Sequence, residues 1–210
     1  MHRFFTIRPE APPRAVLEQW YSTSPLGKRL REQLNKDMGV IRDQWFGYNL
    51  LVIGPNTDIP ISEMTRVRRV LQVLDREQQL RKGYTGVYAH DEELPLETES
   101  VDVVVVLNAL DLSAHPHQLL REVHRVLTPH GHLLIVGTNG WSISGLWHRL
   151  VRLVTGYRSE HARAPGLRRL EDWLTLLEFA IAPVRHKLVV PAAGSSRWTR
   201  WLVSVDEWLV

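Results

Sequence analysis

The sequence predicts an α/β domain in which a doubly wound, mostly parallel sheet lies between two layers of helices. Three observations predict it. Short apolar runs alternate with segments of helical periodicity, the strongest run extends from Val103 to Leu107, and an amphipathic helix over 117–127 connects that run to the next one. A run that is apolar at every position is typical of a strand buried on both faces of a parallel sheet. Strands and helices that alternate in this way form three layers.

The N-terminal region is predicted to be helical. Residues 1–13 are polar and contain several prolines, which is typical of a loosely held arm. From Arg14 to about Trp45, apolar residues recur at helical spacing, with an interruption at Pro25. We therefore expect an N-terminal helical extension over 1–45, which belongs to the same domain and is placed to act as a lid, and a Rossmann-like domain over 46–210.

The strands of this domain are predicted where apolar runs end in turn residues. They are expected over residues 48–53, 70–74, 86–89, 103–107 and 132–136. Pro129 and Gly131 are expected to end the amphipathic helix before the fifth strand. Further helices are predicted over 61–67 and near 145–155 and 169–179, followed by a late strand over 184–190.

Composition limits the classes of function. The 210 residues contain no cysteine, which excludes disulfides, thiolate metal sites and cysteine nucleophiles. The ten histidines lack the spacing of a metal site, so no metal is expected. No apolar run is long enough to span a bilayer, and Met1 to Glu10 do not form a secretory signal, so a cytoplasmic location is expected.

A nucleic-acid or membrane partner is not favoured. The formal net charge of +3 is too small to indicate nucleic-acid binding by itself. Residues 146–169 combine Leu, Trp and Val with many Arg and His residues. A helix packed on the core with a solvated basic face is the preferred interpretation, ahead of a lid that contacts a membrane surface or nucleic acid.

Two residues follow the first two predicted strands. Gly54 begins the turn Gly54-Pro55-Asn56 after the first strand, and Asp75 follows the second one. The carboxyl ends of neighbouring parallel strands meet at one edge of a sheet, where doubly wound folds bind ligands. Glycine allows the main chain to approach a ligand, and a carboxylate at this edge accepts the hydroxyls of a ribose. The pattern predicts a nucleotide-like cofactor, whereas a helix cap or solvated turn is the alternative role of Asp75.

Four segments in succession resemble class I S-adenosylmethionine-dependent methyltransferases of the type-11 family. They are YNLLVIGPNTD, VLQVLD, YAHDEELPLETESVDVVVVLNAL and LLREVHRVLTPHGHLLIVG. The resemblance covers roughly residues 20–190 and is most specific from Leu94 to Val136. The segment GTNGWSISGLW, over 137–147, is similar to a proteobacterial subgroup of that family.

The resemblance implies S-adenosylmethionine as cofactor and methyl transfer to a small or medium-sized acceptor as activity. The turn after the first strand would contact the methionine portion, the second strand end the ribose, and the segment after the third strand the adenine. The implied cofactor-binding residues are Gly54, Pro55, Asn56, Asp75, His90, Asp91, Glu92 and Asn108, the last of which would lie beneath the sulfonium. The candidates near the acceptor are Asn108, Asp111, Asn139 and Trp141. The simpler interpretation of Asp111 is that it begins a helix, and the simpler interpretation of Asn139 is that it belongs to a turn.

Departures from the family pattern define the alternative function. The first turn contains a single glycine, and Val52 replaces an acidic residue. The family places Asp at the position of His90, whereas the nearest Asp here is Asp91. The alternative is a degenerate methyltransferase fold without catalysis, which acts as an interaction or regulatory module.

A nicotinamide-dependent oxidoreductase ranks lower because the glycine fingerprint is incomplete. The family fold closes with a further strand, and two alternatives stay open: either the protein lacks this strand, or the sequence as given stops short of it at Val210. The oligomeric state stays open.

Overall fold

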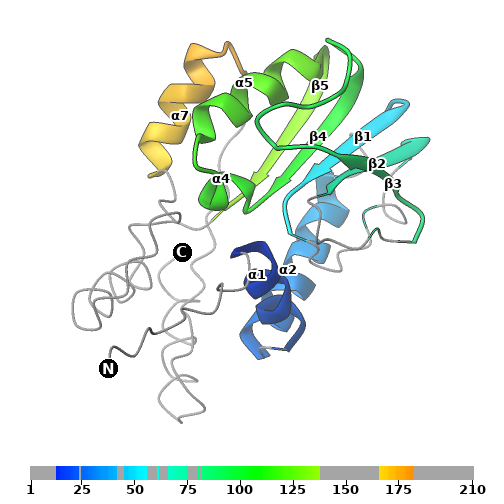
Figure 1. Ribbon diagram of the computed structural model, residues 1–210, viewed down its shortest axis with the longest axis vertical. Helices are drawn as coiled ribbons and strands as arrows, with labels where there is room; N and C mark the ends of the chain where they lie inside the picture. Colours follow the sequence, from blue (N-terminus) through cyan, green and yellow to red (C-terminus); the bar gives the residue numbers. More distant parts are fainter. Residues whose placement is uncertain are drawn as a thin grey trace, which may run out of the picture.

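The computed structural model describes residues 13–23, 25–41, 45–55, 61, 66–74, 80, 82–137 and 166–181. Within this part of the chain, five strands form one parallel sheet in the order β3-β2-β1-β4-β5 (Figure 1). The strands are β1 (Asn49–Ile53), β2 (Arg69–Leu74), β3 (Thr85–Tyr88), β4 (Val101–Leu107) and β5 (Leu127–Val136). The strand order reverses between β1 and β4, which confirms the predicted doubly wound sheet.

Helices cover both faces of this sheet. They are α1 (Pro13–Thr23), α2 (Pro25–Ile41), α4 (Ala109–Leu112), α5 (Pro116–Val126) and α7 (Leu167–Leu176). Figure 1 shows α5 and α7 on one side of the sheet and α2 on the other, and each side has its own apolar cluster. The predicted three-layer arrangement is confirmed. Three of these helices begin with proline. Proline suits this position because an N–H group in the first helical turn has no partner within the helix, so its absence costs no hydrogen bond.

The two central strands contribute to both apolar clusters. The cluster shared with α5 contains Leu51, Ile53, Val104, Val106, Leu119 and Val123. The cluster shared with α2 contains Met38, Leu50, Val52, Val103 and Val105. Because successive side chains of a strand point to opposite faces, a strand covered on both sides must be apolar throughout. This explains the unbroken apolar run that ends at Leu107.

The boundary between α5 and β5 differs from the prediction. The helix ends at Val126 and β5 begins at the next residue, Leu127, rather than at 132. Leu127 pairs with Val101, and the register then shifts. Pro129 and Gly131 lie within this irregular stretch, where a proline removes no regular ladder hydrogen bond. They interrupt the pairing of the strand, so the predicted start of the strand at 132 was wrong, whereas the predicted end of the helix at 127 lies one residue from the observed end.

Several predicted elements lie outside the described residues. These are most of the N-terminal arm, most of the helix over 61–67, the helix near 145–155 and the late strand over 184–190. The predicted helix over 169–179 is present as α7. No helix in the described part of the chain combines the length and the apolar character that crossing a bilayer requires.

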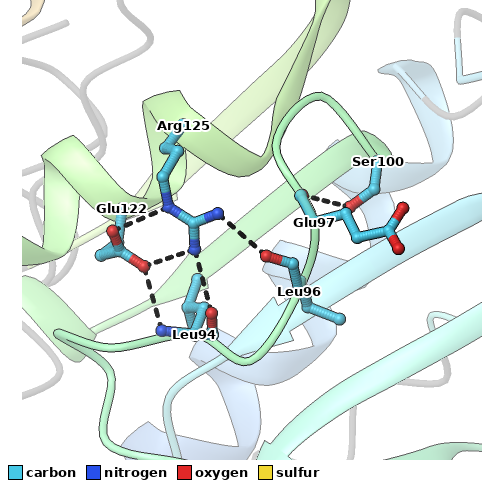
Figure 2. A network of polar contacts seen from close by, with 6 residues as sticks. All are labelled: Leu94, Leu96, Glu97, Ser100, Glu122 and Arg125. Carbon is cyan, nitrogen blue, oxygen red and sulfur yellow. Dashed lines mark hydrogen bonds and ion pairs between the residues drawn. The ribbon is translucent and has the colours of Figure 1, made fainter.

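A polar network connects the segment between β3 and β4 to α5 (Figure 2). The guanidinium of Arg125 donates to both carboxylate oxygens of Glu122, at 2.9 and 2.7 Å. It also donates to the carbonyls of Leu96 and Leu94, each at 2.9 Å. Glu122 in turn accepts the N–H of Leu94 at 3.0 Å. This network therefore holds the chain that follows the segment 90–92 against the core.

We expect Glu122→Gln to reduce stability at neutral pH by about 1 kcal/mol, because a charge-assisted hydrogen bond is lost at a partly exposed site. The hydrogen bond from Arg125 is the main cause that lowers the pKa of Glu122 from its ordinary value of 4.5. A lowered folded-state pKa stabilises the fold above the ordinary value, and this contribution is lost as the pH falls through the folded-state pKa. Urea unfolding from neutral to acidic pH should therefore show the two proteins converging.

The exposed Glu93 provides a matched control for this measurement, because among the described residues its side chain forms no hydrogen bond or ion pair with Arg125 or with α5. Glu93→Gln is expected to unfold like the wild type throughout the pH range. A difference between Glu122→Gln and wild type that stays constant down to acidic pH would contradict the role assigned to the Glu122 carboxylate.

Candidate functional site

The turn after β1 packs tightly against the end of β4. Gly54 has φ = +129°, a conformation that other residues rarely adopt. A Cβ atom at this position would lie 2.0 Å from the carbonyl oxygen of Leu107. Only glycine therefore allows this turn, and both Gly54 and Pro55 are buried at the carboxyl edge of the sheet. Asn56 and Asp75, the other residues predicted here, lie outside the described residues.

Asn108 lies at the same edge, directly after β4. It is 3% exposed and adopts a left-handed conformation with φ = 49°, which asparagine tolerates better than most residues. Its N–H donates to the carbonyl of Val136 at 2.7 Å and so joins the ends of β4 and β5. The structure thus brings Asn108 to the same edge as the Gly54 turn, between β1 and β5.

A buried hydrogen-bond network fixes the side chain of Asn108. The Tyr21 hydroxyl, from α1, donates to Asn108 Oδ1 at 2.9 Å. Asn108 Nδ2 donates to Asp111 Oδ2 at 3.0 Å. Burial of Tyr21, and secondly the negative charge of Asp111, raises the pKa of the Tyr21 phenol. Tyr21 therefore stays protonated and acts as a donor. Asp111 is buried in the single turn of α4.

The segment that follows β3 places its three predicted residues in different environments. His90 is exposed. Glu92 Oε1 accepts hydrogen bonds from Ser113 Oγ and from the N–H of His115, both at 3.1 Å. Asp91 has a side chain that is only 9% exposed, and its Oδ2 forms an ion pair with Arg14 of α1.

The second carboxylate oxygen of Asp91 is unusual. Oδ1 is buried and has no hydrogen-bond partner within the part of the chain that the structure describes. Most buried polar atoms of folded proteins have a partner, because an unpaired one costs about 1–3 kcal/mol. With respect to the described residues, Asp91 therefore has an unused acceptor close to the end of β3, which an N–H donor of a ligand would satisfy.

Tyr21 and Arg14 were missed by sequence reasoning. Both lie on α1, where the sequence pattern predicted a helical extension and assigned no role to single side chains. No local signal connects them to residues near the strand ends. Asn139 and Trp141, which were predicted near the acceptor, lie outside the described residues. Across the described ranges, no three His, Asp or Glu side chains gather in the manner of metal ligands.

The chain is similar to proteins of one family. Residues 59–135 match the family described as "Methyltransferase domain". The protein YafS of Escherichia coli (strain K12), which bears the name "Uncharacterized protein YafS", is 31% identical to this chain over 181 residues. That alignment covers 86% of this chain and 72% of YafS.

Solved structures share the fold. The YcgJ protein from Bacillus subtilis has a TM-score of 0.58 at 16% identity, and the match covers 83% of each chain. An S-adenosylmethionine-dependent methyltransferase from Thermotoga maritima has a TM-score of 0.59 at 16% identity, with 80% of this chain and 81% of the other covered. At this level of identity the likeness describes the fold, and it agrees with the strand order described above.

Proposed function

Because this chain belongs to the class I S-adenosylmethionine-dependent methyltransferases, we propose that it transfers the methyl group of S-adenosylmethionine to a small or medium-sized acceptor. The observation that carries the proposal is the buried Oδ1 of Asp91 near the carboxyl edge of the sheet, which has no hydrogen-bond partner in the described part of the chain. The exocyclic amine of an adenine is an N–H donor that satisfies such an oxygen. The residues present therefore suit an adenosine-containing cofactor.

In this proposal Asp91 takes the adenine contact that the family pattern places at the position of His90. His90 is exposed, whereas the Asp91 side chain is almost fully buried. A hydrogen bond to a buried carboxylate discriminates more strongly than one at an exposed side chain, because water competes less for it. In this proposal the adenine contact has moved by one residue relative to the family pattern, from the position of His90 to Asp91.

The other residues of the edge orient the reactants. S-adenosylmethionine supplies a methyl group that its sulfonium already activates, so the protein contributes mainly alignment and exclusion of water. The Gly54 turn allows the main chain to approach the methionine portion. Tyr21 and Asp111 hold the Asn108 amide in one orientation. Asp111 is the buried carboxylate beside Asn108 and is the candidate base for an acceptor hydroxyl or amine.

Calorimetric titration with two product analogues tests this assignment. We expect S-adenosylhomocysteine to bind and S-inosylhomocysteine, which lacks the exocyclic amine, to bind roughly 10-fold or more weakly, as for a charge-assisted hydrogen bond. Asp91→Ala should remove this discrimination, whereas His90→Ala should preserve it. Equal affinity of both analogues for the wild-type protein would disprove the role of Asp91.

One observation favours the non-catalytic alternative. Side chains of α1 already engage the site, because Tyr21 bonds to Asn108 and Arg14 pairs with Asp91. If these contacts exclude the cofactor, the protein is a methyltransferase fold that acts as an interaction or regulatory module. The same titration separates the two functions, since an absence of heat at millimolar S-adenosylhomocysteine supports the alternative and refutes the enzyme.

A further inference from the structure

A hollow lies at the opposite edge of the sheet, at the amino ends of β1 and β2. It has a volume of about 180 Å³ and is lined by Tyr48, Asn49, Arg68 and Arg69. Since β1 and β2 are parallel, this edge is one strand length away from Gly54, and a strand of five residues is ~16 Å long. The hollow is therefore separate from the site at the carboxyl edge.

The main chain around the hollow is held in place from both sides. The N–H groups of Tyr48 and Asn49 donate to Asp102 Oδ2, at 2.7 and 3.0 Å. The N–H of Arg69 donates to the carbonyl of Tyr48 at 2.8 Å. A Cβ atom at Gly47 would lie 2.2 Å from the Asp102 side chain, so only glycine fits at that contact. These hydrogen bonds therefore fix the main chain of the residues that line the hollow.

Positive charge gathers at this edge. Arg66, Arg68 and Arg69 are exposed at the start of β2, and Lys82 is exposed just before β3. Among the described residues, none of the four has an ion-pair partner. The carboxylate of Asp102 already accepts two main-chain N–H groups. Unpaired arginines next to one another are typical of sites for phosphate, which a guanidinium binds through two parallel hydrogen bonds.

Exposed aromatic rings accompany these charges. Tyr48 is 68% exposed and Phe46 is 60% exposed, whereas their neighbour Trp45 is buried in the core. Single exposed aromatic residues need no explanation, but aromatic rings beside arginines are the combination with which proteins bind single-stranded nucleic acid. The rings stack on bases, and the arginines contact the phosphates.

We propose that this hollow binds a nucleotide unit, with its phosphate on Arg68 and Arg69 and its base stacked on Tyr48. Pockets for whole drug-sized ligands usually measure about 300–1,000 Å³, so a hollow of about 180 Å³ accommodates a single unit. The unit belongs either to a free nucleotide or to a strand of RNA. In the second case Phe46 and Lys82 provide contacts for the neighbouring units.

Fluorescence anisotropy with a labelled oligouridylate tests the proposal on the full chain saturated with S-adenosylhomocysteine, so that the carboxyl-edge site is blocked. The double variant Arg68→Gln/Arg69→Gln should bind at least 10-fold more weakly. Its plot of log affinity against log salt should be shallower by about 0.7, since the two arginines contact one phosphate and each phosphate contact to a single strand contributes about 0.7. Tyr48→Ala should weaken binding by about 5-fold or more, whereas Tyr48→Phe keeps the ring and the affinity.

A matched control removes the same charge elsewhere. Arg121 of α5 and Arg168 of α7 are exposed on helices away from the hollow, and Arg121→Gln/Arg168→Gln should bind like the wild type.

Displacement of the oligonucleotide by uridine monophosphate identifies a free-nucleotide site, and binding of the oligonucleotide alone identifies an RNA site. The proposal is overturned if neither the oligonucleotide nor uridine monophosphate binds, or if Arg121→Gln/Arg168→Gln loses as much affinity as Arg68→Gln/Arg69→Gln. Calorimetry with S-adenosylhomocysteine on the Arg68→Gln/Arg69→Gln variant reports the carboxyl edge separately, so failure at one site is distinguishable from failure at the other.

Discussion

Gly54→Ala is expected to abolish binding of S-adenosylhomocysteine and to lower the melting temperature by roughly 6–12 °C. The new Cβ atom would lie 2.0 Å from the Leu107 carbonyl oxygen, at a residue with φ = +129°. The strained backbone and the overlap together cost about 3 kcal/mol. Because the overlap involves main chain on both sides, relief requires the ends of β1 and β4 to separate. Differential scanning calorimetry and titration of the same sample measure both effects.

Gly39 of α2 is the matched control for this substitution. A Cβ atom at Gly39 meets nothing within 4 Å. Alanine is favoured over glycine inside a helix by about 1 kcal/mol, so Gly39→Ala should melt at or above the wild-type temperature. If Gly54→Ala melts with the wild type and still binds the ligand, the turn after β1 does not form the site described here.

Asn108→Ala is expected to reduce the free energy of unfolding by about 2–5 kcal/mol and to weaken binding of S-adenosylhomocysteine. The substitution leaves the buried Tyr21 hydroxyl and the Asp111 carboxylate without the amide that joins them. Each buried polar group that loses its partner costs about 1–3 kcal/mol. Alanine also disfavours the left-handed φ of 49° at this position. Urea unfolding monitored by circular dichroism measures the loss.

Two companion variants separate these causes. Asn108→Gly loses the same hydrogen bonds but accepts the left-handed conformation, so it should be more stable than Asn108→Ala by about 1 kcal/mol. Tyr21→Phe removes only the hydroxyl and should cost about 1 kcal/mol. Equal stability of Asn108→Ala and the wild type would show that the network does not hold the carboxyl edge together.

Most of the sheet was predictable because its signals are local. The run from Val103 to Leu107 is apolar throughout, and a strand covered by helices on both faces requires that composition. Gly54 was identified from its place after an apolar run, whereas its tight contact with the Leu107 carbonyl oxygen of β4 is visible only in the tertiary structure. The start of β5 was mispredicted, because Pro129 and Gly131 end a helix in most sequences, whereas here they lie in a register shift opposite β4.

The sequence by itself determined the fold class, the five strands and the edge at which Gly54 and Asn108 lie, because periodicity and turn residues act over a few neighbouring positions. Only the tertiary structure decided which side chains meet at that edge. Tyr21 and Asn108 are 87 residues apart, and Arg14 and Asp91 are 77 apart. Such pairs form because the tertiary structure brings α1 to the carboxyl edge of the sheet, and no local sequence pattern encodes that approach. The same packing buries one oxygen of Asp91 without a hydrogen-bond partner among the described residues, while the neighbouring His90 is exposed.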